Sequence, residues 1–296
     1  MSDVTVNEGP GAAGVQQSAG AMVVPGAATA PGTGKTPCMA RSFVAAEDAG
    51  ARGAVRARDA EKAPEAAGAP DVPEVAGVVA APTLILFTRV PKAGQAKTRL
   101  IPALGEQGAA EFQWHLLERL LGELRAGAEQ GFWRLCVYYC GTEGLERLRA
   151  MAGEGVAFVE QVDNPDLGVR MRAALERELA AGAPAVGLMG SDLPEATTGI
   201  VAEALGLLKD LAIDVSLCPV EDGGYWFVGL KRPFSQLFGG TTYGGSSVFE
   251  DALAACAAHG RTVAAGPLLR DVDTPEDLAW FEDWAAGSGA RTAPAV

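Results

Sequence analysis

The sequence has few of the residues that define several common classes of protein. Its five cysteines include no Cys-x-x-Cys pair and it has only two histidines, so neither a zinc module nor a disulfide framework is indicated. It shows no apolar run as long as a membrane span and no secretory signal. We therefore expect a soluble, cytoplasmic protein without a membrane span. The thiols expected to be reduced are Cys38, Cys136, Cys140, Cys218 and Cys256.

The N-terminal stretch lacks the residues that build a hydrophobic core. Residues 1–80 contain no leucine and no isoleucine, and Phe43 is their only aromatic residue. Such a segment cannot bury enough apolar surface to offset its chain entropy. We expect a disordered tail there, with at most a transient helix around Ala54–Ala67. Residues 81–286 are then expected to form one folded domain, followed by a flexible tail at 287–296.

Positive charge is also in short supply. The chain has 24 Lys and Arg residues against 37 Asp and Glu residues, a net charge of −13, of which residues 81–296 carry −10. A domain this acidic is a poor binder of the nucleic-acid backbone. It suits a metal site with a local basic pocket, and the sequence leaves the oligomeric state open.

Short apolar runs alternate with helical patterns through the predicted domain. Strands are predicted at Thr83–Thr88, Trp133–Cys140, Val156–Glu160, Pro184–Met189, Ile213–Pro219, Tyr225–Leu230 and Thr262–Ala265. Helices are predicted at Gly105–Ala128, Thr142–Met151, Gly168–Ala181, Thr197–Leu211, Ser246–His259 and Thr274–Trp284. This alternation predicts an α/β fold with a mostly parallel sheet covered on both faces. Ligands of such sheets bind beyond the carboxyl ends of the strands.

A basic loop, RVPKAGQAKTRL, follows the first predicted strand. Gly94 permits a tight turn, and the loop supplies the four cations Arg89, Lys92, Lys97 and Arg99. The loop after a first strand is where α/β proteins commonly bind phosphates. The segment matches neither GxxxxGK[ST] nor GxGxxG, and the alternative interpretation is a solvated surface loop.

Two acidic segments follow later strands. Asp192, in GSDLP, can bind Mg²⁺ or Mn²⁺ between the phosphates of a nucleotide, or it can belong to a turn before the next helix. In RDVDTPEDL, Thr274 suits a helix N-cap and Asp277 the third helical position, so Asp277 is expected to be structural. Asp271 and Asp273 precede this cap. We assign the second metal carboxylate to Asp273.

The segment EDGGYW joins the fifth and sixth predicted strands. Gly223 and Gly224 are typical of a hairpin turn, but they also permit a sugar or base to approach the backbone closely. Asp222 or Glu221 could then act as a general base. Tyr225 could stack on a substrate ring.

Five segments in this order resemble the GT-A superfamily of nucleotide-diphospho-sugar transferases. They are FTRVPKAGQAKTRLIPALG, DLGVRM, GSDLP, EDGGYWFVGL and LRDVDTPEDL, within about residues 83–284. More narrowly, the domain resembles a bacterial family of arsenosugar-biosynthesis-type glycosyltransferases. The resemblance implies a Rossmann-like three-layer α/β/α sandwich that binds a nucleotide sugar together with Mg²⁺ or Mn²⁺.

The same resemblance implies roles for individual residues. Nucleotide contacts are implied for Arg89, Lys97, Arg99, Gly168 and Arg170. Asp192 corresponds to the metal-binding aspartate, Asp273 to an acidic position near the metal, and Asp222 to an acid on the acceptor side. The chain departs from the family pattern at Asp163–Pro165, where glycines are usual, and at Tyr243, where tryptophan is expected.

Three functions are compatible with these motifs. The first is a metal-dependent glycosyltransferase that moves a sugar from a nucleoside-diphosphate donor to a small-molecule acceptor. The second is a nucleotidyltransferase that takes an NTP and releases pyrophosphate, as in guanylyltransferases of cofactor biosynthesis. The third is a non-catalytic nucleotide-sugar-binding protein, which clustered carboxylates disfavour because they repel one another without a metal.

Overall fold

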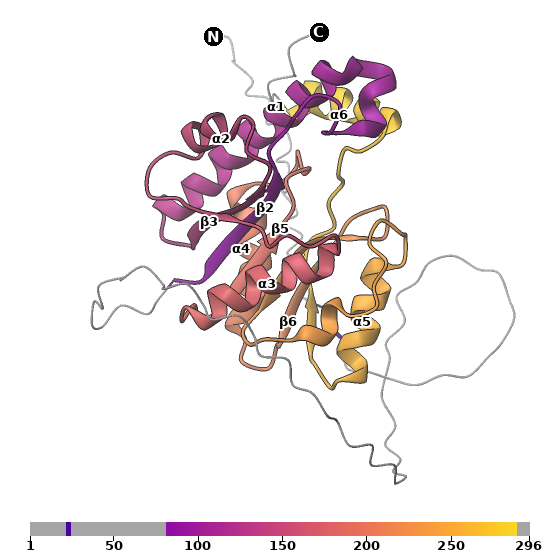
Figure 1. Cartoon of the computed structure of the whole chain (residues 1–296). Helices are drawn as coiled ribbons and strands as arrows, with labels where there is room; N and C mark the ends of the chain where they lie inside the picture. Colours follow the sequence, from indigo (N-terminus) through magenta and orange to yellow (C-terminus); the bar gives the residue numbers. More distant parts are fainter. Residues whose placement is uncertain (1–21, 25–80, 289–296) are drawn as a thin grey trace, which may run out of the picture.

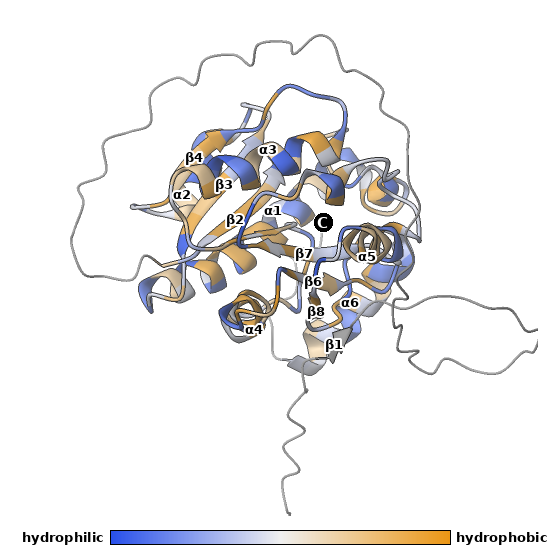
Figure 2. Ribbon diagram, turned by 90° about the horizontal axis from the view of Figure 1, so that it is seen from below, coloured by the Kyte–Doolittle hydropathy of each residue, from blue (hydrophilic) through white to orange (hydrophobic). Residues whose placement is uncertain are grey.

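The computed structural model describes residues 22–24 and 81–288, in which a central sheet lies between two layers of helices (Figures 1 and 2). The sheet has eight strands in the order β1-β8-β6-β7-β5-β2-β3-β4. Their bounds are β1 Met22–Val24, β2 Thr83–Arg89, β3 Arg134–Cys140, β4 Ala157–Glu160, β5 Val186–Met189, β6 Val215–Pro219, β7 Tyr225–Leu230 and β8 Val263–Ala265. Strands β2 and β5 form where continuous apolar runs allow burial on both faces, whereas the edge strand β4 is largely exposed.

The central strands are parallel, and β7 is the exception inside the sheet. Parallel pairs join β2 to β3, β2 to β5, β3 to β4 and β6 to β8. Strand β7 runs antiparallel to both β5 and β6. The turn between β6 and β7 therefore lies at the same edge as the carboxyl ends of β2, β3 and β5.

Helices cover both faces of the sheet. The helices are α1 Ile101–Glu129, α2 Leu145–Ala152, α3 Leu167–Ala180, α4 Thr198–Gly206, α5 Val248–Ala258 and α6 Pro275–Ser288, with short 3-10 helices η1 Thr98–Leu100, η2 Leu207–Lys209 and η3 Ser235–Phe238. Helices α1, α2 and α4 bury Leu117, Leu148 and Val201 against one face. Helices α3 and α5 bury Leu175 and Ala252 against the other (Figure 2).

A third, smaller cluster fixes the last helix at the carboxyl edge. The rings of Phe112 on α1 and Phe281 on α6 meet edge to face, with centroids 5.2 Å apart. Leu100 and Val272 are fully buried in the same cluster. Because Leu100 belongs to the basic loop and Val272 to the last acidic segment, this packing brings the two segments together.

The predicted fold class is confirmed: the domain is a three-layer α/β/α sandwich with a mostly parallel sheet. One difference concerns Met22–Val24, which lie in the predicted tail but form β1 by antiparallel pairing with β8. The rest of residues 1–80, including the helix predicted at Ala54–Ala67, lies outside the described residues. Helix α6 extends four residues past its predicted end, to Ser288.

The cysteines within the described part of the chain are free thiols. Cys136, Cys218 and Cys256 are buried, and Cys140 is half-buried. Burial raises the pKa of each of the three buried thiols to about 12, which keeps them protonated. Cys38 lies outside the described residues. Across those residues, no helix combines the length and apolarity needed to cross a bilayer.

Candidate nucleotide and metal site

A cavity of about 560 Å³ opens at the carboxyl edge of the sheet. Its walls come from the basic loop after β2, the ends of β3 and β5, the β6–β7 turn and the last acidic segment. All four segments singled out in the sequence thus reach one cavity. This is the place where ligands bind in sheets of this type.

The basic loop folds through two left-handed residues. The amides of Gln95 and Ala96 both donate to the carbonyl of Lys92, at 3.0 and 2.9 Å, around Gly94 with φ of 75°. Lys97 follows with φ of 45°, the only non-glycine residue with positive φ in the described part of the chain. A side chain in this conformation is strained, and such strain is concentrated at functional sites.

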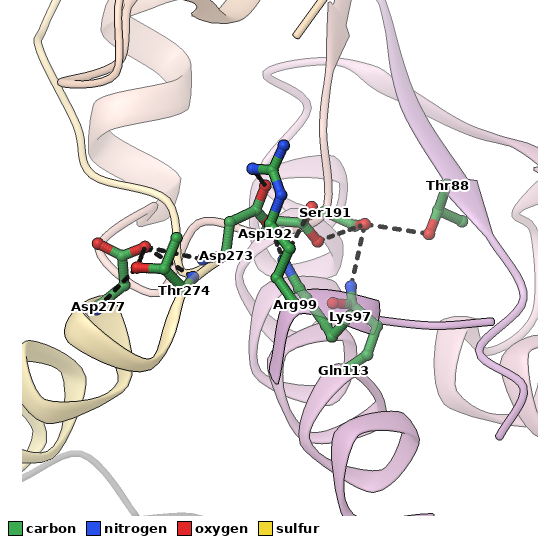
Figure 3. Close-up of polar contacts among 9 residues, drawn as sticks. All are labelled: Thr88, Lys97, Arg99, Gln113, Ser191, Asp192, Asp273, Thr274 and Asp277. Atoms are coloured by element: carbon green, nitrogen blue, oxygen red, sulfur yellow. Dashed lines mark hydrogen bonds and ion pairs between the residues drawn. The ribbon is translucent and has the colours of Figure 1, made fainter. Parts of the chain in front are cut away.

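The strained backbone directs Lys97 between two aspartates (Figure 3). Its Nζ lies 3.0 Å from Asp192 Oδ2 and 2.7 Å from Asp273 Oδ1, and its side chain is 4% exposed. Burial alone would lower the pKa of Lys97, but the two carboxylates raise it above its ordinary value. The lysine is therefore a charged ammonium that joins the first loop to both acidic segments.

A buried network of polar side chains holds Asp192 in position. The hydroxyl of Ser191 accepts hydrogen bonds from Thr88 Oγ1 and Gln113 Nε2, both at 3.1 Å, and donates to Asp192 Oδ1 at 3.2 Å (Figure 3). Gln113 Oε1 is the only buried side-chain polar atom without a partner among the described residues. An orphaned acceptor in the wall of a cavity is costly unless a ligand supplies a donor.

The donor set fits a hard divalent cation shared with a substrate. Lys97 uses one oxygen of each aspartate. Asp192 Oδ1 accepts the Ser191 hydroxyl and Asp273 Oδ2 lies 3.9 Å from Arg99 Nη1, yet more than a third of each aspartate side chain stays exposed in the cavity wall. No group of three or more His, Cys, Asp or Glu side chains converges as a metal cage within residues 22–24 and 81–288. Two carboxylates are nevertheless enough for Mg²⁺, because this ion usually takes its remaining ligands from water and phosphate oxygens.

Negative charge is concentrated near this pair. Burial raises the pKa of Asp271 to about 6, and the neighbouring carboxylates of Asp273 and Asp222 add to the increase. A bound cation would relieve this repulsion. The Asp271 side chain also lines the cavity.

The β6–β7 turn brings Asp222 to the cavity and leaves Glu221 outside its lining. Asp222 is exposed, and its Oδ1 accepts the Gly224 amide at 2.9 Å. Glu221 lies 3.8 Å from Arg270 in an ion pair. Gly223 has φ of 92°, and a Cβ there would lie 2.1 Å from the Ser246 carbonyl oxygen. This glycine is thus required by the neighbouring chain, whereas Gly224 lines the cavity.

Two tyrosines form another part of the cavity wall. Tyr225 and Tyr243 both line the cavity, and their hydroxyl oxygens are 3.3 Å apart. Burial raises the pKa of both phenols, so both stay protonated. Gly168 lies behind this wall, since a Cβ there would lie 2.9 Å from a ring carbon of Tyr243. The predicted contact residue Gly168 therefore leaves space for Tyr243 and does not line the cavity itself.

Arg170 reaches the cavity from α3. Its guanidinium lies 5.6 Å from the Phe87 ring centroid, donates to Gln161 Oε1, and is 3.3 Å from Cys140 Sγ. Gln161 is itself fixed by hydrogen bonds from its amide to the carbonyls of Thr88 and Tyr138. Arg170 is thus held in place and presents its charge to the cavity.

The remaining basic residues divide between the cavity and the surface. Arg89 and Arg99 are exposed side chains that line the cavity, and Arg99 Nη1 lies 3.9 Å from Asp273 Oδ2. Lys92 lies outside the lining and forms a 2.5 Å ion pair with the exposed Glu143. The loop therefore directs three of its four predicted cations to the cavity.

The helix start after Asp273 is confirmed as structural. The Asp277 amide donates to Thr274 Oγ1 at 3.3 Å, and Asp277 Oδ2 accepts the Thr274 amide at 2.8 Å, a reciprocal capping box. Asp277 Oδ1 also accepts from Arg270 Nη2 at 2.8 Å. This cap fixes the backbone on which Asp273 is carried.

Two glutamines of the site were not predicted from the sequence. Gln161 directly follows β4, so the rule that ligands gather at carboxyl ends could have found it. Gln113 is a polar residue among the buried positions of α1, next to Phe112 and Trp114. A polar side chain on the apolar face of a helix was the available signal.

A family model matches part of this chain. The family model of uncharacterised proteins conserved in bacteria (DUF2064) matches residues 123–245, which include Arg170, Asp192 and Asp222. No curated protein sequence matches the chain. The narrower arsenosugar-biosynthesis group stays a prediction.

Solved structures share the architecture. A protein of Desulfovibrio desulfuricans G20, assigned as a nucleotide-diphospho-sugar transferase, is 29% identical over 72% of this chain and 92% of its own, with a TM-score of 0.62. A cytidylyltransferase of Leptospira borgpetersenii is 13% identical over 70% and 87%, with a TM-score of 0.46. The manganese complex of Rv0371c from Mycobacterium tuberculosis H37Rv is 21% identical over 69% and 99%, with a TM-score of 0.40. Of these three proteins, the one from Desulfovibrio has a TM-score above 0.5, and it shares the α/β fold of this chain.

Proposed function

We propose that the protein is a metal-dependent glycosyltransferase that moves a sugar from a nucleoside-diphosphate donor to a small-molecule acceptor. The observation that carries this proposal is the convergence of Lys97, Asp192 and Asp273 from three distant segments on one cavity. The similarity to the Desulfovibrio transferase over nearly all of that protein's length supports it.

The charge of the cavity favours a nucleotide sugar over an NTP. Its lining carries four cations and four carboxylates: Arg89, Lys97, Arg99 and Arg170 against Asp192, Asp222, Asp271 and Asp273. A nucleoside-diphosphate sugar has one negative charge on each phosphate, so its complex with a divalent cation is neutral and leaves this balance unchanged. The complex of the same cation with an NTP brings additional negative charge.

The residues divide the chemistry between them. Asp192 and Asp273 would hold Mg²⁺ or Mn²⁺, which stabilises the negative charge that develops on the departing diphosphate. Arg89, Lys97 and Arg99 would neutralise the same phosphate oxygens.

Transfer itself needs a base that takes one proton from the acceptor hydroxyl. The acceptor oxygen forms a bond to the anomeric carbon while the bond from that carbon to the diphosphate oxygen breaks, and the diphosphate leaves with the electron pair. The exposed carboxylate of Asp222, which lines the cavity, would take the proton of the acceptor hydroxyl. Tyr225 and Tyr243, which also line the cavity, would contact the sugar or the acceptor.

The proposal is tested by thermal shift with NTPs and nucleotide sugars, each with and without Mg²⁺ or Mn²⁺. A metal-dependent rise in melting temperature with one nucleotide sugar, followed by release of its nucleoside diphosphate on turnover, is expected. A rise with an NTP alone and release of pyrophosphate would establish nucleotidyl transfer instead. Binding of a nucleotide sugar without any product in the presence of candidate acceptors would favour a binding protein.

A further inference from the structure

Lys97 already offsets one of the two negative charges on the carboxylates proposed to hold the metal. Its ammonium contacts both Asp192 and Asp273 within 3.0 Å and is almost fully buried between them (Figure 3). A divalent cation that approached these carboxylates alone would lie close to a fixed positive charge. Like charges at short distance in a partly buried site repel strongly.

The position of Lys97 is built into the fold. Its backbone is held in the left-handed region at φ of 45°, and its carbonyl accepts the Leu100 amide at 2.8 Å at the start of η1. Leu100 is fully buried in the cluster that includes Val272, next to Asp273. The ammonium is thus fixed by local backbone geometry and by packing.

Resting on the proposed function, we infer that Lys97 acts as a stand-in cation, so that the divalent metal and the phosphate-bearing substrate enter the site together. Phosphate oxygens would supply a new anionic partner for the ammonium and additional ligands for the metal. Either component alone would unbalance the charge of the cavity, whereas the pair leaves it unchanged. Lys97 is a positioning residue in this scheme, because it sets when the metal can bind.

The first test uses the metal alone, so it does not depend on the identity of the donor. Mn²⁺ is titrated calorimetrically into the wild-type chain and into Lys97→Met, without any phosphate. The variant is expected to bind Mn²⁺ at least tenfold more tightly, which corresponds to about 1.4 kcal/mol. Lys209→Met removes the same charge from an exposed position outside the cavity and is expected to match the wild type. Equal or weaker Mn²⁺ binding by Lys97→Met would overturn the inference.

The second test needs no variant and therefore survives a failure of Lys97→Met to fold. The melting temperature of the wild-type chain is measured with Mn²⁺ alone, with inorganic pyrophosphate alone, and with both. The shift with both is expected to exceed the sum of the two single shifts, because coupled ligands stabilise each other reciprocally. If Mn²⁺ alone gives the full shift, Lys97 does not delay metal binding.

These results separate the inference from the proposed function. Tight Mn²⁺ binding by Lys97→Met, together with no response of the wild type to any nucleotide sugar, would support the role of Lys97 and contradict glycosyl transfer. A metal-dependent response to a nucleotide sugar, together with unchanged Mn²⁺ binding by Lys97→Met, would support glycosyl transfer and contradict the role of Lys97.

Discussion

Ion pairs of a buried side chain lie at opposite edges of the same sheet, and they differ in how much of their carboxylates is exposed. At the amino edge, Glu178 on α3 is 5% exposed and contacts Arg134, Tyr138 and Cys136. Each of its two oxygens has a partner, the guanidinium on one and the Tyr138 hydroxyl at 2.7 Å on the other. At the carboxyl edge, Asp192 and Asp273 keep 38% and 39% of their side chains exposed to the cavity.

The comparison shows how the same interaction can be structural or available to a ligand. A buried carboxylate whose oxygens are all bonded holds elements together and has no capacity for a ligand. The carboxylates around Lys97 also have further partners, Ser191 on Asp192 and Arg99 near Asp273, but more than a third of each side chain stays exposed beside the cavity. Burial of charge alone therefore does not identify a site. The exposure that a paired carboxylate keeps to a cavity does.

The largest effect is expected from breaking the amino-edge ion pair of Glu178 and Arg134. Replacing Glu178 with alanine removes the partner of Arg134, Tyr138 and Cys136 and should lower the free energy of unfolding by about 3 kcal/mol. Binding of metal and nucleotide should stay unchanged. Chemical denaturation measures the loss, and Glu178→Gln, which keeps most of the shape, should lose less. A loss below about 1 kcal/mol would mean that the amino-edge pair is not structural.

The second effect is expected from changing the carboxyl-edge cluster of Lys97, Asp192 and Asp273, called the open cluster below. Asp192→Asn keeps the shape of the side chain but removes the charge, and it should weaken metal-dependent nucleotide binding about 100-fold, or about 2.7 kcal/mol. The free energy of unfolding should change little. Asp283→Asn removes one charge from an exposed position on α6 and serves as the control. Unchanged metal and nucleotide binding by Asp192→Asn would show that the metal is assigned to the wrong residue.

The fold was predictable because its signals are local. Apolar runs and helical periodicity located each strand and helix of the predicted domain to within a few residues, as at Tyr225–Leu230, where the bounds agree. The Gly223–Gly224 turn indicated the hairpin that makes β7 antiparallel. The strand at Met22–Val24 was not predicted, because a three-residue strand depends on its partner β8 and not on its own sequence.

The site was predictable only in part because its contacts are long-range. Strand-end position was enough to bring Asp192 and Asp273 to one edge. It could not show that Lys97, 95 residues before Asp192, would lie between them. Nor could it show that Gly223 is needed by Ser246 and that Lys92 turns to Glu143. Those outcomes depend on how loops pack after the sheet has formed.

The smallest expected effect concerns Asp277, a satisfied acid that lies beside the open cluster. Burial would raise its pKa, but hydrogen bonds from Arg270 and Thr274 prevail and lower the pKa to about 2, from 3.8. A carboxylate with a depressed pKa stabilises the folded state above its unfolded pKa, and this contribution is lost as the pH falls through its folded pKa. Asp277 should therefore contribute about 2 kcal/mol above pH 4 and progressively less toward pH 2.

This contribution can be isolated from the titration of other acids by a difference measurement. The free energies of unfolding of the wild type and Asp277→Asn are compared from pH 6 down to pH 2. Their difference should be largest at pH 6 and shrink toward low pH, because the wild-type carboxylate becomes protonated and then resembles the amide. If the difference stays constant across this range, the donors around Asp277 do not favour its charged form, and full pairing of a carboxylate would not by itself make it structural.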